Sequence, residues 1–245
     1  MHRCLIPTAS ILEETCALDR ESARHLQTVL RVQPGDVVQL FDGAGRARLA
    51  KVETASRNGI TFTAAEPLFT APRPATRVTL FACVSKGKRM DWTIEKAVEL
   101  GISRIVPVLS AHTVVKIPPE EREAKTERWQ RIAEEAMRQS CSFWCPEILP
   151  PVKFGESLEL VAQSQPVFVG ALTPDAEPFR TALNRYPKAP ENAGWYVGPE
   201  GDFSPEELDA LRQAGTVPVS LGPTVLRAET ACLYGLCVLN CAFCR

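Results

Sequence analysis

Two Gly-Pro corners near the C-terminal end most strongly constrain the fold of this chain. Residues 197–204 read Val-Gly-Pro-Glu-Gly-Asp-Phe-Ser, and residues 221–231 read Leu-Gly-Pro-Thr-Val-Leu-Arg-Ala-Glu-Thr-Ala. Each corner follows an apolar, strand-like run, which indicates a strand end that carries a loop. In open α/β sheets ligands bind at the carboxyl ends of the strands. The sequence therefore predicts an α/β domain with its ligand site at these two loops.

Strand-like and helical segments alternate from residue 78 onward. The continuous apolar run Val78–Val84 is typical of a strand buried on both faces, and Gly101 marks the C-terminal end of a helix. Ser204, Pro205 and Glu207 form an N-terminal capping box. The alternation predicts a mostly parallel sheet with helices on both faces. Expected strands cover 78–84, 105–109, 167–172, 195–197 and 217–221, and expected helices cover 90–100, 120–140 and 229–244, with one more beginning at 205.

The first seventy or so residues have a β-rich pattern instead. Asp42-Gly43 and Asn58-Gly59 are hairpin signals, and the apolar positions after Gly59 alternate with polar ones. Two prolines between residues 71 and 76 indicate a stiff linker. The expected organisation is a small β domain over 1–70, a linker over 71–76 and an α/β domain over 77–245.

Composition limits the function classes. The chain has 245 residues, 45% of them hydrophobic, and a formal net charge of -1, so binding of nucleic acid requires a local basic patch. The N-terminus lacks an apolar signal core, and the nearly apolar run 231–243 is too short to span a bilayer. The 9 cysteines are an odd number, which favours reduced thiols over a disulfide framework. We expect a soluble, cytosolic protein that does not enter a membrane.

The first corner is not a phosphate-binding loop. Gly198-Pro-Glu-Gly201 lacks the Gly-Lys-Ser/Thr ending and is not a Gly-x-Gly-x-x-Gly sequence. On its own it is equally consistent with a simple turn before a capped helix. The second corner places Arg227 and Glu229 at the start of the last helix, although the helix dipole alone also favours a glutamate there.

Several motifs in the same order resemble the RsmE family, the small-subunit ribosomal RNA uracil-N3 methyltransferases of the SPOUT superfamily. The resemblance rests on both corners, on Lys86–Gly101 (Lys-Gly-Lys-Arg-Met-Asp-Trp-Thr-Ile-Glu-Lys-Ala-Val-Glu-Leu-Gly), on residues 25–36 and on residues 128–140. It implies an α/β SPOUT methyltransferase domain with a trefoil knot, preceded by a PUA-like β-barrel that helps to bind RNA. It also implies a homodimer that uses S-adenosylmethionine and acts on ribosomal RNA or the assembled small subunit.

The corner loops suit this cofactor, which has no phosphate and needs backbone groups between apolar side chains. Attack by uracil N3 on the methyl group requires loss of the N3 proton and therefore a base or an anion-stabilising group. As a hypothesis, Arg227 steadies the uracil oxygens, and Glu229 or Glu200 accepts the proton or orients Arg227. The expected cofactor-binding residues are Leu172, Gly198, Gly201, Leu221, Gly222 and Leu226.

Three positions depart from the family pattern. His112, Ser142 and Thr224 stand where the family usually has arginine, the natural residue for contacts with phosphate or uracil. His112 is either a base or, more simply, a hydrogen-bonded histidine at a strand end. The departures leave two alternatives open: a catalytically weak or inactive relative that binds S-adenosylmethionine and RNA, or a methyltransferase that acts on a different RNA.

Basic residues in two regions are candidates for RNA binding, although each also suits a solvated surface. Cys237, Cys241 and Cys244 have the spacing of an iron–sulfur motif, but small residues on an apolar helix explain them better, and no metal is expected. The dimer interface is expected on the last helix and on the long helix around Trp129. The RNA-binding candidates are Arg24, His25, Arg31, Lys86, Lys88 and Arg89.

Overall fold

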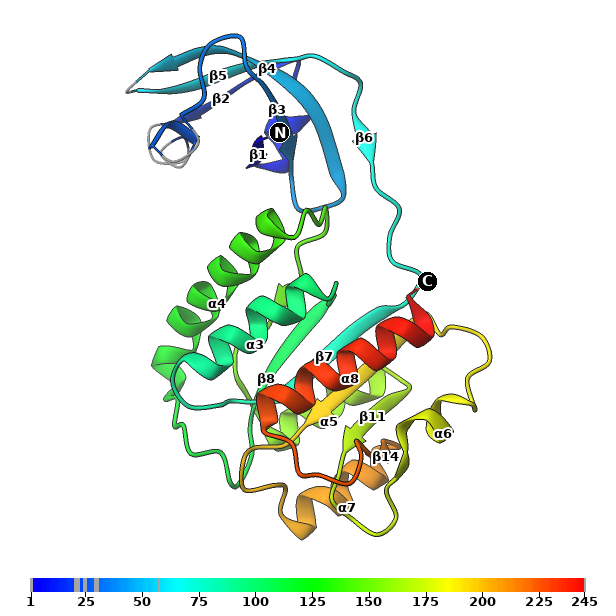
Figure 1. Ribbon diagram of the computed structural model, residues 1–245. Helices are drawn as coiled ribbons and strands as arrows, with labels where there is room; N and C mark the ends of the chain where they lie inside the picture. The colour runs from blue at the N-terminus through cyan, green and yellow to red at the C-terminus, as the bar shows by residue number, and fades with distance from the viewer. Residues whose placement is uncertain (1, 20–22, 24–25, 29–30, 57, 245) are drawn as a thin grey trace. The chain divides into compact units, whose positions relative to one another are not determined.

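The computed structural model describes residues 2–19, 23, 26–28, 31–56 and 58–244 (Figure 1). The chain divides into two compact units. The first unit comprises Met1–Arg73 and Met137–Cys145, and the second unit comprises Pro74–Ala136 and Pro146–Arg245. Sequence patterns had not indicated that 137–145 belongs with the first unit. The N–H of Gly45 donates to the carbonyl of Phe143 at 2.9 Å, and the N–H of Cys145 donates to that of Gly43 at 2.8 Å. Backbone hydrogen bonds between residues about a hundred positions apart in the sequence therefore add the segment 137–145 to the first unit.

The first unit is built on one twisted sheet in the order β1-β3-β4-β5-β2, with β6 paired to β4. Its inward positions, including Val38, Leu40 and Phe62, are almost fully buried, as the period-two pattern requires. The elements are β1 (His2–Leu5), α1 (Thr8–Ile11), β2 (Thr15–Asp19), β3 (Val37–Phe41), β4 (Arg46–Ser56), β5 (Gly59–Ala64) and β6 (Phe69–Thr70).

The hairpin predicted at Asp42-Gly43 is confirmed between β3 and β4. The Asp42 carboxylate accepts hydrogen bonds from the backbone N–H groups of Ala44 at 2.8 Å and Arg46 at 3.0 Å. Gly45 has a φ of +90°, and an added Cβ would lie 2.2 Å from the Trp144 ring. Both the backbone conformation and the close contact explain why glycine stands there.

The second unit contains an eight-stranded sheet in the order β10-β8-β7-β13-β11-β14-β12, with β9 paired to β8. Every strand pairing described in this sheet is parallel, which confirms the predicted α/β class. The strands are β7 (Arg77–Cys83), β8 (Arg104–Leu109), β9 (Glu147–Ile148), β10 (Val152–Lys153), β11 (Val167–Gly170), β12 (Glu177–Pro178), β13 (Asn192–Val197) and β14 (Val217–Ser220).

Helices cover both faces of this sheet. Helices α3 and α8 pack against each other, and α8 also contacts β7 and β13, whereas α5 and α7 contact each other on the opposite face (Figure 1). The Trp195 indole on β13 donates a hydrogen bond of 3.1 Å to the Ala231 carbonyl, which seats α8 on the sheet. The helices are α3 (Lys88–Glu99), α4 (Pro119–Gln139), α5 (Phe154–Gln163), α6 (Phe179–Leu183), α7 (Pro205–Gln213) and α8 (Ala228–Phe243).

One expectation about α4 is wrong. A dimer interface around Trp129 requires an exposed apolar side on this helix, but Trp129 is only 3% exposed, and Ala133 and Ala136 are also buried. The Trp129 indole donates to Asp91 of α3 at 3.2 Å. The apolar face therefore packs against its own chain. Among the described residues, none of the helices combines the length and hydrophobicity needed to cross a membrane.

Candidate cofactor and active site

Three loops meet at the carboxyl end of the parallel sheet. Because β11 lies between β13 and β14, the loops that follow these three strands are neighbours. They enclose a cavity of about 290 Å³. Its position at the strand ends is the one expected for ligand sites in α/β sheets. Residues Gly170, Ala171, Leu172, Val197, Gly198, Pro199, Glu200, Asp202, Val219, Ser220, Leu221, Gly222, Thr224, Val225, Leu226, Arg227, Ala228 and Ala231 line it.

The loop after β13 is tightly constrained. A Cβ on Gly198 would lie 3.0 to 3.3 Å from the Phe203 ring, so glycine allows the loop to fold over this ring. The Ser204 hydroxyl accepts from the Glu207 N–H at 3.2 Å, and the Glu207 carboxylate accepts from the Ser204 N–H at 3.0 Å. This confirms the predicted capping box. The same carboxylate accepts from the N–H of Ala111 at 2.8 Å, so it also ties down the loop after β8.

His112, in the loop after β8, also binds the loop after β13. Its ring Nδ1 lies 3.1 Å from the carbonyl of Gly201 and 2.9 Å from that of Asp202. Carbonyl oxygens only accept, so Nδ1 carries the proton and donates. This arrangement matches the hydrogen-bonded histidine of the simpler interpretation. Gly201 takes part in this contact and lies outside the cavity lining.

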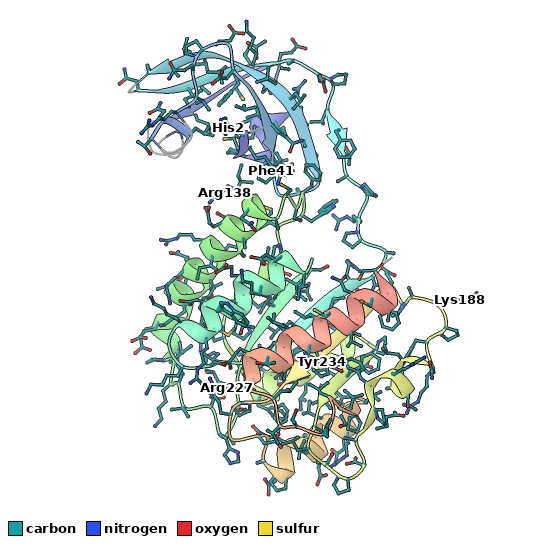
Figure 2. All side chains as sticks on the ribbon, viewed as in Figure 1. His2, Phe41, Arg138, Lys188, Arg227 and Tyr234 are labelled. Atoms are coloured by element: carbon teal, nitrogen blue, oxygen red, sulfur yellow. The ribbon has the colours of Figure 1, made fainter. Side chains whose placement is uncertain are left out.

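The loop after β14 supplies most of the expected cofactor-binding residues. Leu221, Gly222 and Leu226 all line the cavity. Gly222 has a φ of +122°, a conformation that side chains other than glycine's rarely allow. Arg227 ends the loop at the start of α8, where its exposed side chain also lines the cavity (Figure 2). The second Gly-Pro corner therefore lies along one wall of this cavity.

The loop after β11 contributes Leu172 and is held by an ion pair. The guanidinium of Arg212 on α7 donates two hydrogen bonds of 3.0 Å to the carboxylate of Asp175. These bonds favour the charged carboxylate and lower the pKa of Asp175 to about 2. Leu172 is 65% exposed at the cavity, a large exposed area for a leucine in a structured loop.

The two candidate acidic residues have different environments. Glu200 lines the cavity, and its carboxylate accepts a hydrogen bond of 2.8 Å from Arg89 on α3. Glu229 lies in the first turn of α8, between the lining residues Ala228 and Ala231, but does not itself line the cavity. One of its carboxylate oxygens, Oε2, is buried and has no hydrogen-bond partner among the described residues. A buried, unpaired acceptor is costly and therefore informative.

The remaining predicted residues belong to both units. Lys86 and Lys88 are exposed around the start of α3, and Arg31 is exposed with a φ of +52°. Arg24 and His25 lie outside the described residues. Of the positions that depart from the family pattern, Thr224 lines the cavity, and the Ser142 carbonyl accepts a hydrogen bond from Arg3 at 3.1 Å.

Sequence reasoning missed part of the lining. Gly170 and Ser220 end strands β11 and β14, and Ala171 and Val219 are their direct neighbours, so the position of the strand ends would have identified them. Ala231 is different because it reaches the cavity from α8 only when that helix is seated on the sheet. No local pattern contains that information.

The cysteines form no recognisable metal site within the described ranges. No group of three or more His, Cys, Asp or Glu side chains there is arranged to hold a metal ion. Cys237 and Cys241 are exposed on α8, whereas Cys244 lies near the Thr76 carbonyl. Burial raises the pKa of the Cys83 thiol, on β7, to about 12, which makes it unreactive.

Comparison with known proteins defines the class. Residues 72–240 match the model of an RNA methyltransferase domain, and residues 18–64 match that of an RNA methyltransferase PUA domain. The parallel sheet and its three-loop cavity thus belong to an RNA methyltransferase domain that follows a PUA domain.

Individual relatives narrow the assignment. Ribosomal RNA small subunit methyltransferase E of Synechocystis is 32% identical over 98% of this chain and 77% of its own length. A methyltransferase of Legionella pneumophila, solved with bound SAM, is 29% identical with a TM-score of 0.87, covering 98% of this chain and 97% of that one. The Neisseria gonorrhoeae methyltransferase E, solved with S-adenosyl methionine, is 28% identical with a TM-score of 0.87, covering 99% and 98%. The chain belongs to the ribosomal RNA small subunit methyltransferase E (RsmE) family.

Proposed function

We propose that the protein transfers a methyl group from S-adenosylmethionine to N3 of a uridine in small-subunit (16S) ribosomal RNA. The observation that carries this proposal is the cavity at the strand ends, which is built from both motif loops of the family. Family membership and the two solved relatives that hold the cofactor support it.

The lining fits the proposed cofactor. Leu172, Leu221 and Leu226 offer apolar side chains around an adenine or a methionine chain, and Gly198 and Gly222 leave room for close backbone contact. The cavity of about 290 Å³ lies near the small end of small-molecule sites. When bound, S-adenosylmethionine supplies an electrophilic methyl group. Gly201 acts indirectly in this proposal, because its carbonyl and that of Asp202 accept the hydrogen bonds of His112.

The chain's own residues prepare the uracil. Arg227, at the rim of the cavity, donates hydrogen bonds to the uracil oxygens and stabilises the anion that forms when N3 loses its proton. Glu229 is the better candidate for the proton acceptor: no described residue binds its buried oxygen, and this role requires its side chain to turn from the first turn of α8 into the cavity, which it does not line in this structure. Glu200 is already bound to Arg89 and serves to position that side of the cavity.

The partners and boundaries are part of the same proposal. The substrate is ribosomal RNA, free or in the assembled small subunit, and the protein acts in the cytoplasm. The β domain covers 1–70 and takes in the segment 137–145, the linker covers 71–76, and the methyltransferase domain covers the rest of 77–245, with the chain end threaded as a trefoil knot. Arg24, His25, Arg31, Lys86, Lys88 and Arg89 contact the RNA backbone.

The outer side of α8 supports a homodimer. Tyr234 is 44% exposed (Figure 2), and the exposed Cys237 and Cys241 line the same groove beside α8. A groove of about 550 Å³ runs between this side and α6, and Leu221 of the cofactor loop lines it. A second copy seated there would cover these apolar side chains and brace the cofactor loop.

The direct experiment uses labelled S-adenosylmethionine and small ribosomal subunits that lack the modification. Digestion of the RNA and mass spectrometry should identify 3-methyluridine. Glu229→Gln should lower kcat roughly a hundredfold or more while cofactor affinity is kept. Full turnover and unchanged cofactor affinity in Arg227→Ala would exclude the assigned role of Arg227.

The same experiment distinguishes the two alternatives raised by His112, Ser142 and Thr224, which stand where the family usually has arginine. Cofactor binding without methyl transfer to any RNA would show a binding protein. Transfer to another RNA, with small subunits unmodified, would show a different substrate.

A further inference from the structure

A second cavity lies beside the cofactor cavity and has a different character. Its volume is about 270 Å³, and it opens between the end of β7, the start of α3, the segment before α4, and α4 itself. Val84, Met90 and Ile117 form apolar walls, each at most 5% exposed. The side chains of Lys88, Lys125 and Arg128 also line it. An apolar pocket with several cations suits a flat base that carries a phosphate.

The charges in this cavity are arranged to act on a ligand. Asp91 is the acidic residue of the lining, and it accepts hydrogen bonds from the Arg128 guanidinium and from the Trp129 indole. Asp91 thus orients Arg128 and offsets its charge. Lys88 and Lys125 remain as the net positive charge of the cavity. Lysine acts as a point charge toward phosphate.

The topology places the two cavities next to each other. Strand β7 pairs in parallel with β13, and Ala82 lies opposite Val197. Val84 therefore follows one strand into the second cavity, while Gly198 follows the neighbouring strand into the cofactor cavity. The hydrogen bond between Arg89 and Glu200 links the two walls.

We infer that this second cavity binds a nucleotide of the RNA substrate that flanks the target uridine. The inference rests on the proposed function and adds to it a specific RNA subsite. The apolar walls hold the base, and Lys88 and Lys125 hold its phosphate. The two cavities lie at the ends of adjacent strands. A nucleotide bound in the second cavity would therefore determine which nearby uridine of the same RNA reaches the cofactor cavity.

Lys125→Gln tests this inference, with Lys188→Gln as the matched control. Lys188 is an exposed lysine on the loop after α6, far from α3 and α4 in Figure 2. The affinity of the full chain for a single-stranded fragment of small-subunit RNA around the target uridine is measured at several salt concentrations. Lys125→Gln should weaken binding roughly threefold to tenfold and reduce the slope of log K against log salt by about 0.7. Lys125→Arg should restore both values, whereas Lys188→Gln should change neither.

Equal affinities and equal salt slopes for Lys125→Gln and Lys188→Gln would overturn the inference. Thermal unfolding of each variant identifies any folding defect. If Lys125→Gln is defective, the RNA affinity and salt slope of Lys125→Arg, which keeps the charge, decide the outcome. Methyl transfer by the unaltered protein is measured separately. If RNA binding depends on Lys125 but no methyl group is transferred, the RNA subsite stands and the proposed reaction fails.

Discussion

The guanidinium of Arg89 donates a hydrogen bond of 2.8 Å to the carboxylate of Glu200. Arg89 lies in the first turn of α3, and Glu200 lies in the loop after β13, 111 residues further along the chain. The pair joins the proposed cofactor cavity to the helix that borders the second cavity. A contact at this position is suited to aligning the two sites.

Loss of this pair should affect activity more than stability. Both side chains are about one-third to one-half exposed, so Arg89→Ala should change the free energy of unfolding by less than about 1 kcal/mol. Misplacement of Glu200 should lower kcat for methyl transfer roughly tenfold at saturating RNA, a condition that compensates for loss of the proposed contact between Arg89 and RNA. Arg77→Ala is the matched control because it breaks a pair of similar length with Glu191, at the start of β7. Equal activities of the two variants would show that the Arg89 contact has no positioning role.

Gly235→Ala should strongly destabilise the second unit. A Cβ there would lie 2.1 Å from the Trp195 ring, so α8 must move off the sheet or Trp195 must leave its position. We expect a loss of about 2 to 3 kcal/mol in urea unfolding. Gly155→Ala in α5 is the control: its added Cβ would meet open space among the described atoms, and helix propensity predicts a gain of about 0.5 to 1 kcal/mol. Wild-type stability of Gly235→Ala would contradict the close packing of α8.

Asp175 should make the free energy of unfolding fall as the pH is lowered. Hydrogen bonds from Arg212 hold its folded pKa at about 2, below the value of about 3.9 of an unfolded chain. Because the folded pKa is lowered, the stabilisation is present above about pH 4 and is lost as the pH falls toward 2. Urea unfolding between these pH values should show this loss in the wild type and less of it in Asp175→Asn. The difference should shrink at about 1 M salt, since the pair is exposed.

Thiol labelling should separate buried from exposed cysteines and test the proposed dimer. Burial raises the pKa of Cys4 and Cys83 to about 12, so neither should react in the folded protein. Cys141, Cys237 and Cys241 are exposed and should react first with a thiol reagent in a monomer. In a dimer formed through α8, Cys237 and Cys241 should react more slowly than Cys141, and dilution should remove the difference. Equal rates at every protein concentration would count against this interface.

Local sequence signals predicted individual elements in both units. The capping box at Ser204 and Glu207, the turn at Asp42-Gly43 and the buried run of β7 each act within a few residues, and all three are confirmed. Helix α5 (Phe154–Gln163) escaped prediction because its start lacks the usual small polar cap; the Lys153 N–H is instead satisfied by Glu156. The short strands β9, β10 and β12 were also missed, since two residues carry no periodicity.

Local patterns along the chain were sufficient to predict the α/β class, the β-rich first part and the motif loops, because turns, caps and buried strands depend on neighbouring residues. Contacts between distant groups depend on the complete fold. The Glu207 carboxylate reaches the Ala111 N–H, and Arg89 reaches Glu200, across about a hundred residues of chain. Burial of Trp129 likewise depends on Asp91 and the packing of α3. Such contacts depend on strand order and helix placement, which arise only when the whole sheet forms.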